Sequence, residues 1–105
     1  MHPCCCCWQV NASLRQLAGL VLKNQIKSTF RSLPVNAQSV VRKGTLLAAR
    51  DHVVAVRHTA GTVVTTLVSV AGLSSWGELL PAVVGMLESG DLELGDGALD
   101  ILVKV

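Results

Sequence analysis

The sequence predicts an all-α fold in which about five antiparallel helices stack as an α-solenoid. A short pattern occurs twice, 42 residues apart, as LRQLAG at residues 14–19 and VRHTAG at residues 56–61. A blurred third copy, ELGDGA at residues 93–98, follows 37 residues after the second. A period near 40 residues is typical of helical repeats, each of which buries its apolar side against the next. Apolar residues also recur at helical spacing, and no long stretch alternates with the period of two that a half-buried strand needs.

The first helix is expected from about Asn11 to Arg31. Asn11 or Ser13 can cap it, because their side-chain oxygens accept hydrogen bonds from exposed backbone N–H groups. The apolar side of this helix consists of Leu14, Leu17, Ala18, Val21, Leu22, Ile26 and Phe30. A polar stripe at i, i+4 spacing consists of Lys23, Asn24, Lys27 and Arg31. The helix should therefore have one buried side and one wet side.

The second helix is expected at about residues 36–50, and the third runs from just after Asp51 to about Ala71. Gly72 should end the third helix, since glycine readily adopts the backbone conformation found after a helix C-terminus. β-branched residues are frequent at 62–70, but the length and the apolar spacing of this segment favour a helix over a strand.

The fourth helix is expected from near Ser75 to about Ser89. Ser75 is a good N-cap, and Glu78 three residues later completes a capping box. Pro81 lies inside this segment, where it would kink the helix or shift its start.

The fifth helix is expected from near Leu92 to Val105, with Gly95 and Gly97 weakening its start. Pairs of small residues recur at the same place in each copy of the pattern, at 18–19, 60–61 and 97–98. Inside a helix, glycine is less stable than alanine by up to about 1 kcal/mol. We therefore expect close contact between helices at these positions.

Basic residues are concentrated in the first half of the chain and acidic residues in the second. Residues 1–57 hold eight of the nine Lys and Arg and one of the seven acids. A basic half suggests nucleic acid or an acidic partner. The bases are spread over three predicted helices, however, and one Phe and two Trp offer little for base stacking. Nucleic-acid binding is therefore not expected.

The chain is unusually apolar, with 50% hydrophobic residues, 15% charged residues and a mean hydropathy of +0.52. This surface must be buried either in a membrane or against neighbouring repeats. Residues 59–77 carry no charge and approach the length of a membrane span. Because their Thr and Ser residues gather mostly on one side of the helix, we expect a half-buried helix and no membrane insertion.

Residues 1–10 are expected to form an irregular or disordered Cys-rich segment. Cys4 to Cys7 are contiguous, which is not the C-x2-C spacing that lets cysteines share one metal ion, even with His2 nearby. No metal site or cofactor is therefore expected. The segment lacks the apolar core and cleavage site of a secretory signal, so an intracellular location is expected.

The acidic residues near the C-terminus offer little for catalysis. Asp91, Glu93, Asp96 and Asp100 are clustered, but acid–base chemistry also needs a pocket. Asp91 and Glu93 more simply favour the N-terminus of a helix. No Ser or Cys has the context of an activated nucleophile, so the chain is not expected to be an enzyme.

Asp51 and Arg57 resemble the signature of HEAT repeats, in which an Asp at the turn and an Arg in the following helix form a hydrogen-bonded ladder between repeats. A guanidinium fork can reach both a carboxylate and carbonyl groups of the adjacent repeat. Arg15 holds the position of Arg57 in the first copy of the pattern. The positions equivalent to Asp51 are Gln9 and Ser89, so the ladder is expected to be incomplete.

Four segments resemble elements of the importin-beta family of nuclear transport receptors, in its transportin branch. They are LAGLVLKNQIK at 17–27, VRHTAGTVVTTL at 56–67, LSSWGELLP at 73–81 and LESGDLELGDGALD at 87–100. They occur in order over about residues 11–105. The chain departs from the family pattern at Gly77, where the family has Pro, and at residues 1–10, which replace the first helix of a repeat.

The resemblance implies an N-terminal fragment of about two and a half HEAT repeats, each near 40 residues long. It implies a non-enzymatic role in nuclear import, with location in cytoplasm and nucleus. The N-terminal repeats of the family bind the GTP form of the small GTPase Ran, while nuclear-pore proteins and cargo would be partners only of a full-length receptor. Carried over to the first and fifth helices, the candidate GTPase contacts are Lys23, Asn24, Lys27, Asp96 and Asp100. The alternative is a general α-solenoid scaffold that binds proteins without GTPase dependence.

Overall fold

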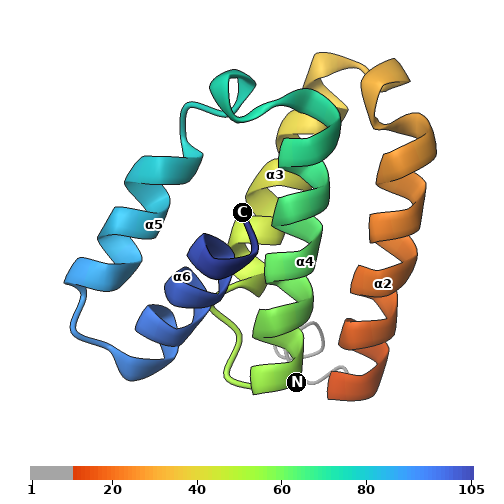
Figure 1. Ribbon diagram of the computed structural model, residues 1–105. Helices are drawn as coiled ribbons and strands as arrows, with labels where there is room; N and C mark the ends of the chain where they lie inside the picture. Colours follow the sequence, from red (N-terminus) through yellow and green to blue (C-terminus); the bar gives the residue numbers. More distant parts are fainter. Residues whose placement is uncertain (1–10) are drawn as a thin grey trace.

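The computed structural model describes residues 11–105, and in this range the chain is all-α, as predicted. The helices are α2 (Ala12–Thr29), α3 (Val35–Ala48), α4 (Val54–Ala71), α5 (Leu79–Glu88) and α6 (Leu92–Lys104), shown in Figure 1. Two 3-10 turns, Phe30–Ser32 and Leu73–Ser75, follow α2 and α4. The interpretation of residues 1–10, with Cys4 to Cys7, lies outside the described residues.

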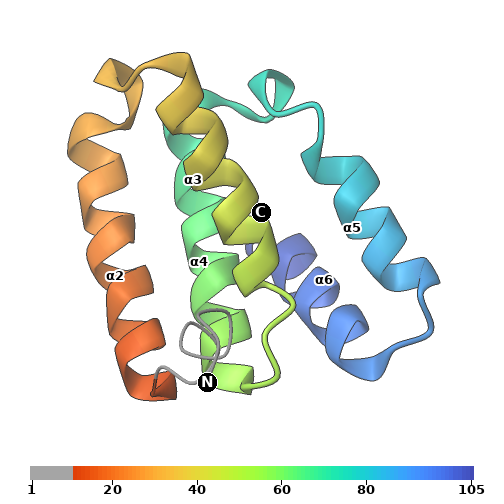
Figure 2. The ribbon, with the colours of Figure 1, turned by 180° about the vertical axis from the view of Figure 1, so that it is seen from behind.

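The helices form two layers. The inner layer consists of α2, α4 and α6, which pack side by side in that order and run in the same direction (Figure 1). The outer layer consists of α3, which packs on α4, and α5, which packs on α6; Figure 2 shows it from behind. Each outer helix thus runs antiparallel to the inner helix that follows it, which is the arrangement of a stacked helical-hairpin solenoid.

The central helix α4 supplies most of the core, because nine of its residues are buried. It is long and apolar enough to cross a membrane, but half of it is covered by the surrounding helices. Four threonine hydroxyls of α4 donate hydrogen bonds to the carbonyl four residues earlier. These bonds satisfy the hydroxyls within the helix, so α4 can be buried on several sides at little polar cost.

The repeated small residues lie where helices approach closely, as predicted. A Cβ added to Gly19 would come within 2.7 Å of Cγ2 of Thr59 on α4. A Cβ on Gly61 would collide with the Asp100 carboxylate on α6, and one on Gly97 would collide with the Ala49 carbonyl. Gly97 thus leaves room for a backbone carbonyl, while Gly19 and Gly61 leave room for a side chain of the neighbouring helix.

The predicted capping box at Ser75 is wrong. The Ser75 hydroxyl donates hydrogen bonds to the carbonyls of Ala71 and Gly72, which close a 3-10 turn after α4. The fourth helix begins only at Leu79, and Glu78 makes no side-chain capping bond. Pro81 therefore falls in the first turn of α5, where its missing N–H would have had no intrahelical partner.

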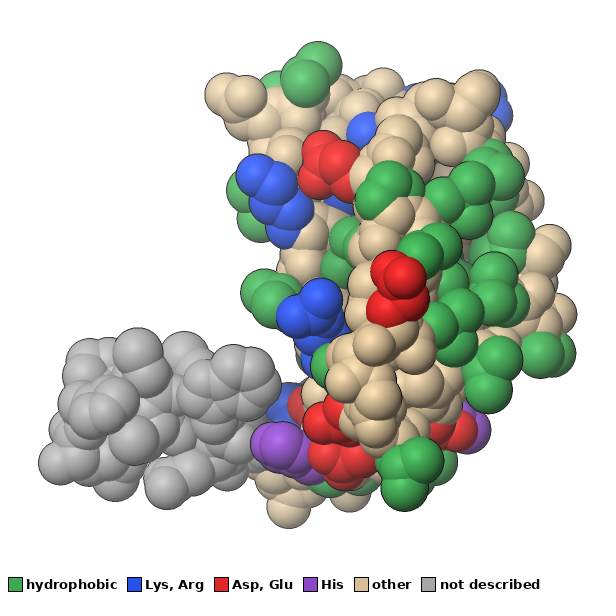
Figure 3. Space-filling view, turned by 90° about the vertical axis from the view of Figure 1, so that its left-hand side faces the viewer, with side chains coloured by type: hydrophobic (Ala, Val, Ile, Leu, Met, Phe, Trp, Pro, Cys, Tyr) green, Lys and Arg blue, Asp and Glu red, His purple; other side chains and the backbone are tan. Residues whose placement is uncertain are grey.

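The predicted apolar side of the first helix is only partly buried. Ile26 and Phe30 are in the core, whereas Leu14, Leu17 and Val21 are exposed. Exposed apolar side chains also gather at the opposite end of the stack, on α5 and α6, which Figure 3 faces. The described residues therefore leave an apolar surface at each end of the stack.

Candidate functional site: a polar ladder and the inner-layer face

The connection between α3 and α4 is fixed by a carboxylate. Asp51 is almost fully buried, and its Oδ1 accepts a hydrogen bond of 2.9 Å from the Val53 backbone N–H just before α4. Arg15 on α2 approaches the same carboxylate with two groups, Nε at 3.0 Å from Oδ2 and Nη2 at 3.1 Å from Oδ1. This bidentate pair is the strong geometry for a guanidinium and a carboxylate, and it ties α2 to the turn before α4.

Arg57 forms the next step of the ladder. Its side chain is buried, with only 5% of it exposed. Its Nη1 donates hydrogen bonds to the carbonyls of Asp51 at 2.9 Å and His52 at 3.0 Å. Its Nε donates to Oδ2 of Asp96 on α6 at 3.0 Å. A buried guanidinium is stable only when its donors are paired in this way.

The contact between α4 and α6 is a network of charged side chains. Nε2 of His58 lies 3.0 Å from the same Asp96 oxygen that Arg57 contacts. Lys104 Nζ donates to the His58 carbonyl at 2.7 Å and to Asp100 Oδ2 at 2.8 Å. The hydrogen bond from Arg57, followed by that from His58, lowers the pKa of Asp96 below its ordinary value against the opposing effect of desolvation.

The structure thus joins the predicted ladder residues Arg15, Asp51 and Arg57 in one chain of hydrogen bonds. Asp96 was not predicted as the continuation of this ladder. The position equivalent to Asp51 in the third copy of the pattern is Ser89, which is not an acid. Spacing could have indicated Asp96, because Arg57 and Asp96 are 39 residues apart and Arg15 and Asp51 are 36 apart. The missed residue lies within a helix and not in the preceding turn, which explains why the repeat pattern did not reveal it.

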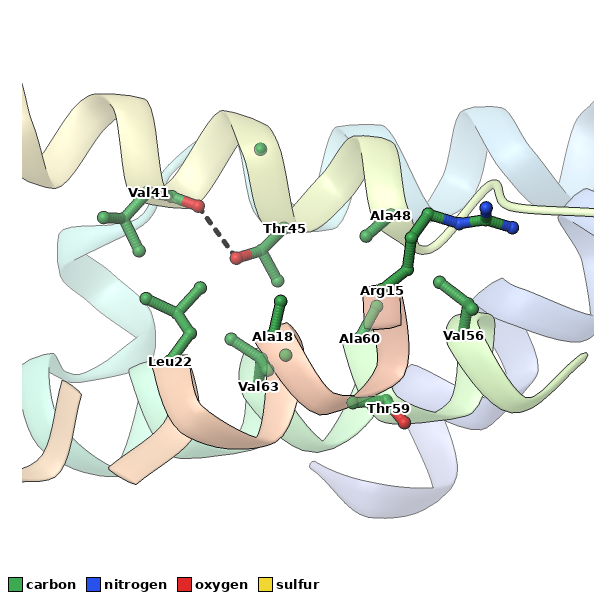
Figure 4. Close-up of a pocket in the computed structure, with 12 residues that line it drawn as sticks. Arg15, Ala18, Leu22, Val41, Thr45, Ala48, Val56, Thr59, Ala60 and Val63 are labelled. Carbon is green, nitrogen blue, oxygen red and sulfur yellow. Dashed lines mark hydrogen bonds between the residues drawn. The ribbon is translucent and has the colours of Figure 1, made fainter. Parts of the chain in front are cut away.

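An apolar hollow of about 200 Å³ lies between α2 and α3, with α4 as its floor. Figure 4 shows aliphatic side chains pointing into it, among them Ala18 and Leu22 from α2 and Val63 from α4. The Thr45 hydroxyl at its wall is already bonded to the Val41 carbonyl at 2.8 Å. The hollow therefore offers packing surface and not a set of convergent polar groups for chemistry.

Comparison with known proteins shows where this architecture belongs. A family profile described as Importin-beta N-terminal domain matches residues 9–49. Over 91 residues, or 87% of the chain, the sequence is 37% identical to Transportin-1 of Oryza sativa subsp. japonica. Also over 91 residues each, it is 36% identical to Transportin of Dictyostelium discoideum and 33% identical to Transportin-1 of Homo sapiens. The chain belongs to the importin-beta family, on its transportin branch. It spans about a tenth of the length of these relatives, since the matches cover 10% of each.

Within this importin-beta family chain, the five predicted GTPase contacts fall into two separate groups. Lys23, Asn24 and Lys27 lie on α2, where none of them makes a hydrogen bond or ion pair with another described residue. Asp96 and Asp100 lie on α6 and are bound to Arg57, His58 and Lys104. Because α4 lies between α2 and α6, the five residues do not form one cluster (Figure 1).

Proposed function

We propose that residues 11–105 form a HEAT-repeat segment that binds proteins as part of nuclear transport. Its inner layer would contact a Ran-type small GTPase in the GTP form. Family membership supports this role. The main structural observation in its support is the polar group on α2. Asn24 and Lys27 are exposed, Lys23 is half-buried, and none of the three has a partner among the described residues. In this role the chain acts by binding and not by catalysis, and it occurs in both cytoplasm and nucleus.

The α2 group is a better candidate for the main contact than the α6 carboxylates. A partner that bound Asp100 would have to compete with Lys104, and Asp100 is mostly buried. A partner at Asp96 would compete with Arg57 and His58, although Asp96 is half-exposed. Breaking existing charged hydrogen bonds cancels much of the gain from new ones. We infer that Lys23 and Lys27 supply most of the electrostatic attraction and that Asp96 and Asp100 mainly hold α6.

The test is binding of the full 105-residue chain to a Ran-type GTPase loaded with a non-hydrolysable GTP analogue or with GDP. We expect binding only to the GTP-like form. Reversing both charges with K23E and K27E should weaken this binding about tenfold, because an exposed ion pair contributes about 0.2–1 kcal/mol and each reversal adds repulsion.

K43E is the matched control, since Lys43 is an exposed lysine on outer-layer α3. It should leave the affinity unchanged. Equal binding to both nucleotide forms, or no binding, would contradict GTPase recognition. Nucleotide-independent binding of other proteins would then support the general scaffold. Nuclear-pore proteins and cargo are proposed as partners only for a receptor with additional repeats.

A further inference from the structure

The two ends of the inner layer expose similar apolar stripes. At the α2 end the stripe consists of Leu14, Leu17 and Val21, and Leu17 is 56% exposed. At the α6 end it consists of Leu99, Leu102 and Val103, and Leu102 is 46% exposed. Figure 3 shows hydrophobic side chains gathered on the α5–α6 side of the molecule, with acidic side chains among them. Large exposed apolar patches on soluble proteins usually mark contact surfaces.

The charges at the two ends are opposite. Residues 12–32, which include α2, hold four basic residues and no acidic one. Residues 79–105, which include α5 and α6, hold five acidic residues and one lysine. Glu93, Asp96 and Asp100 already form ion pairs within the chain, and the two acids with no ion pair among the described residues, Glu88 and Asp91, are exposed. Two α2 ends facing each other would bring like charges together, and so would two α6 ends. An α2 end facing an α6 end brings opposite charges together, which favours that pairing over a two-fold dimer.

The geometry of the inner layer also suits this pairing. Because α2, α4 and α6 run in the same direction, the α2 of a second copy can lie beside α6 as α4 lies beside α2 (Figure 1). The junction would lack a ladder step, since the third copy of the pattern, at residues 93–98, contains no arginine. Apolar contact and overall charge would therefore hold it, without a guanidinium fork.

We propose that a second copy of this chain docks head to tail, with its α2 end on the α6 end of the first. The interface is heterologous, so each added copy leaves one free end of each kind. The chain should then grow stepwise with concentration and not stop at a dimer.

Sedimentation velocity of the full 105-residue chain over a wide concentration range tests the proposal. We expect the mean mass to rise past that of a dimer. Leu17→Glu blocks the α2 end and Leu102→Glu blocks the α6 end, so each variant alone should remain monomeric. An equimolar mixture should form a 1:1 heterodimer and nothing larger, because each variant keeps the end that the other has lost.

Val40→Glu is the matched control, because Val40 is 71% exposed but lies on α3, away from both stripes. This variant should assemble like the unchanged chain. Circular dichroism confirms that each variant keeps its helices. A heterodimer in the mixture would also show that both variants fold, because an unfolded chain has neither docking end.

Three results would overturn the proposal. The first is a chain that stays monomeric at every concentration. Residues 1–10 or a different protein would then be the candidates for covering the apolar stripes. The second is a mixture of the two blocked variants that stays monomeric. The third is a dimer formed by either blocked variant alone, which would indicate a two-fold interface.

Discussion

The contact between α2 and α4 and the contact between α4 and α6 hold equivalent places in the stack, but different chemistry stabilises them. The first is largely apolar, with Gly19 against Thr59 and one guanidinium fork, Arg15 on Asp51. The second is held by charged groups, with Gly61 against Asp100 and the network of Arg57, His58 and Lys104. Close approach at a glycine is therefore the shared requirement of the two contacts, while their polar groups differ.

The largest effect is expected for Arg57→Leu, because Arg57 is the one side chain of the described ladder that touches both the α3–α4 turn and α6. Its removal leaves the Asp51 and His52 carbonyls without their donor and Asp96 without its main partner. Each buried carbonyl left unpaired costs about 1–3 kcal/mol, whereas the charge left on Asp96 is half-exposed, so the free energy of unfolding should fall by about 2–4 kcal/mol. Urea denaturation at low protein concentration measures it.

Arg50→Ala is the control for this variant, since Arg50 is exposed just before the ladder. It should change the free energy of unfolding by less than about 0.5 kcal/mol. A loss below about 1 kcal/mol for Arg57→Leu would show that the ladder contributes little to the α4–α6 contact.

The next effect concerns the glycines. Gly97→Ala places a methyl group against the backbone carbonyl of Ala49, so α6 must move away from the end of α3. Overpacking of this kind costs about 1–3 kcal/mol. Gly85→Ala in α5 meets nothing within 4 Å and should instead stabilise the chain by about 0.5–1 kcal/mol through helix propensity. Opposite signs in thermal or urea unfolding support close approach as the shared requirement, and equal signs contradict it.

The smallest effect is expected in the pH dependence of stability, to which Asp96 contributes at the contact between α4 and α6. The folded pKa of Asp96 lies below its ordinary value of 3.8, so its contribution to stability is present above that value. The contribution is lost as the pH falls through the lower, folded pKa. Asp96→Asn should therefore reduce stability at pH 7 and make the loss below about pH 4 shallower than in the unchanged chain.

Urea midpoints between pH 7 and pH 2.5 measure this difference. Gln16→Ala on α2 is a neutral control outside the ladder and should follow the unchanged chain in parallel. If Asp96→Asn also runs parallel to the unchanged chain, the α4–α6 network does not depend on the charge of Asp96.

The spacing of apolar residues, together with capping and helix-ending residues, was enough to predict most of the helices. Asn11 caps α2 by accepting a hydrogen bond from the Ser13 N–H, and Gly72 ends α4 with a φ of 87°. Both features depend on local backbone geometry, which nearby residues determine. The start of α5 depends instead on tertiary packing, because Trp76 is buried between the expected cap and the helix. A local capping rule cannot foresee that competition.

The polar ladder likewise contains one residue that only tertiary packing brings into place. Arg15, Asp51 and Arg57 could be selected from the repeat pattern, since each holds a recurring position. Asp96 joined them only through the way α6 packs on α4. Periodicity also predicted that Leu14, Leu17 and Val21 share a side of α2, but it could not predict whether another helix covers them.

Arg57 also couples movements that would otherwise be independent. The same guanidinium holds the carbonyls of the α3–α4 turn and the carboxylate of Asp96, while Asp51 in that turn holds Arg15. A change in the angle between α4 and α6 should therefore shift the turn and, through it, α2. Bending of this stack would then be a concerted deformation of the inner layer, with a stiffness that depends on one buried arginine.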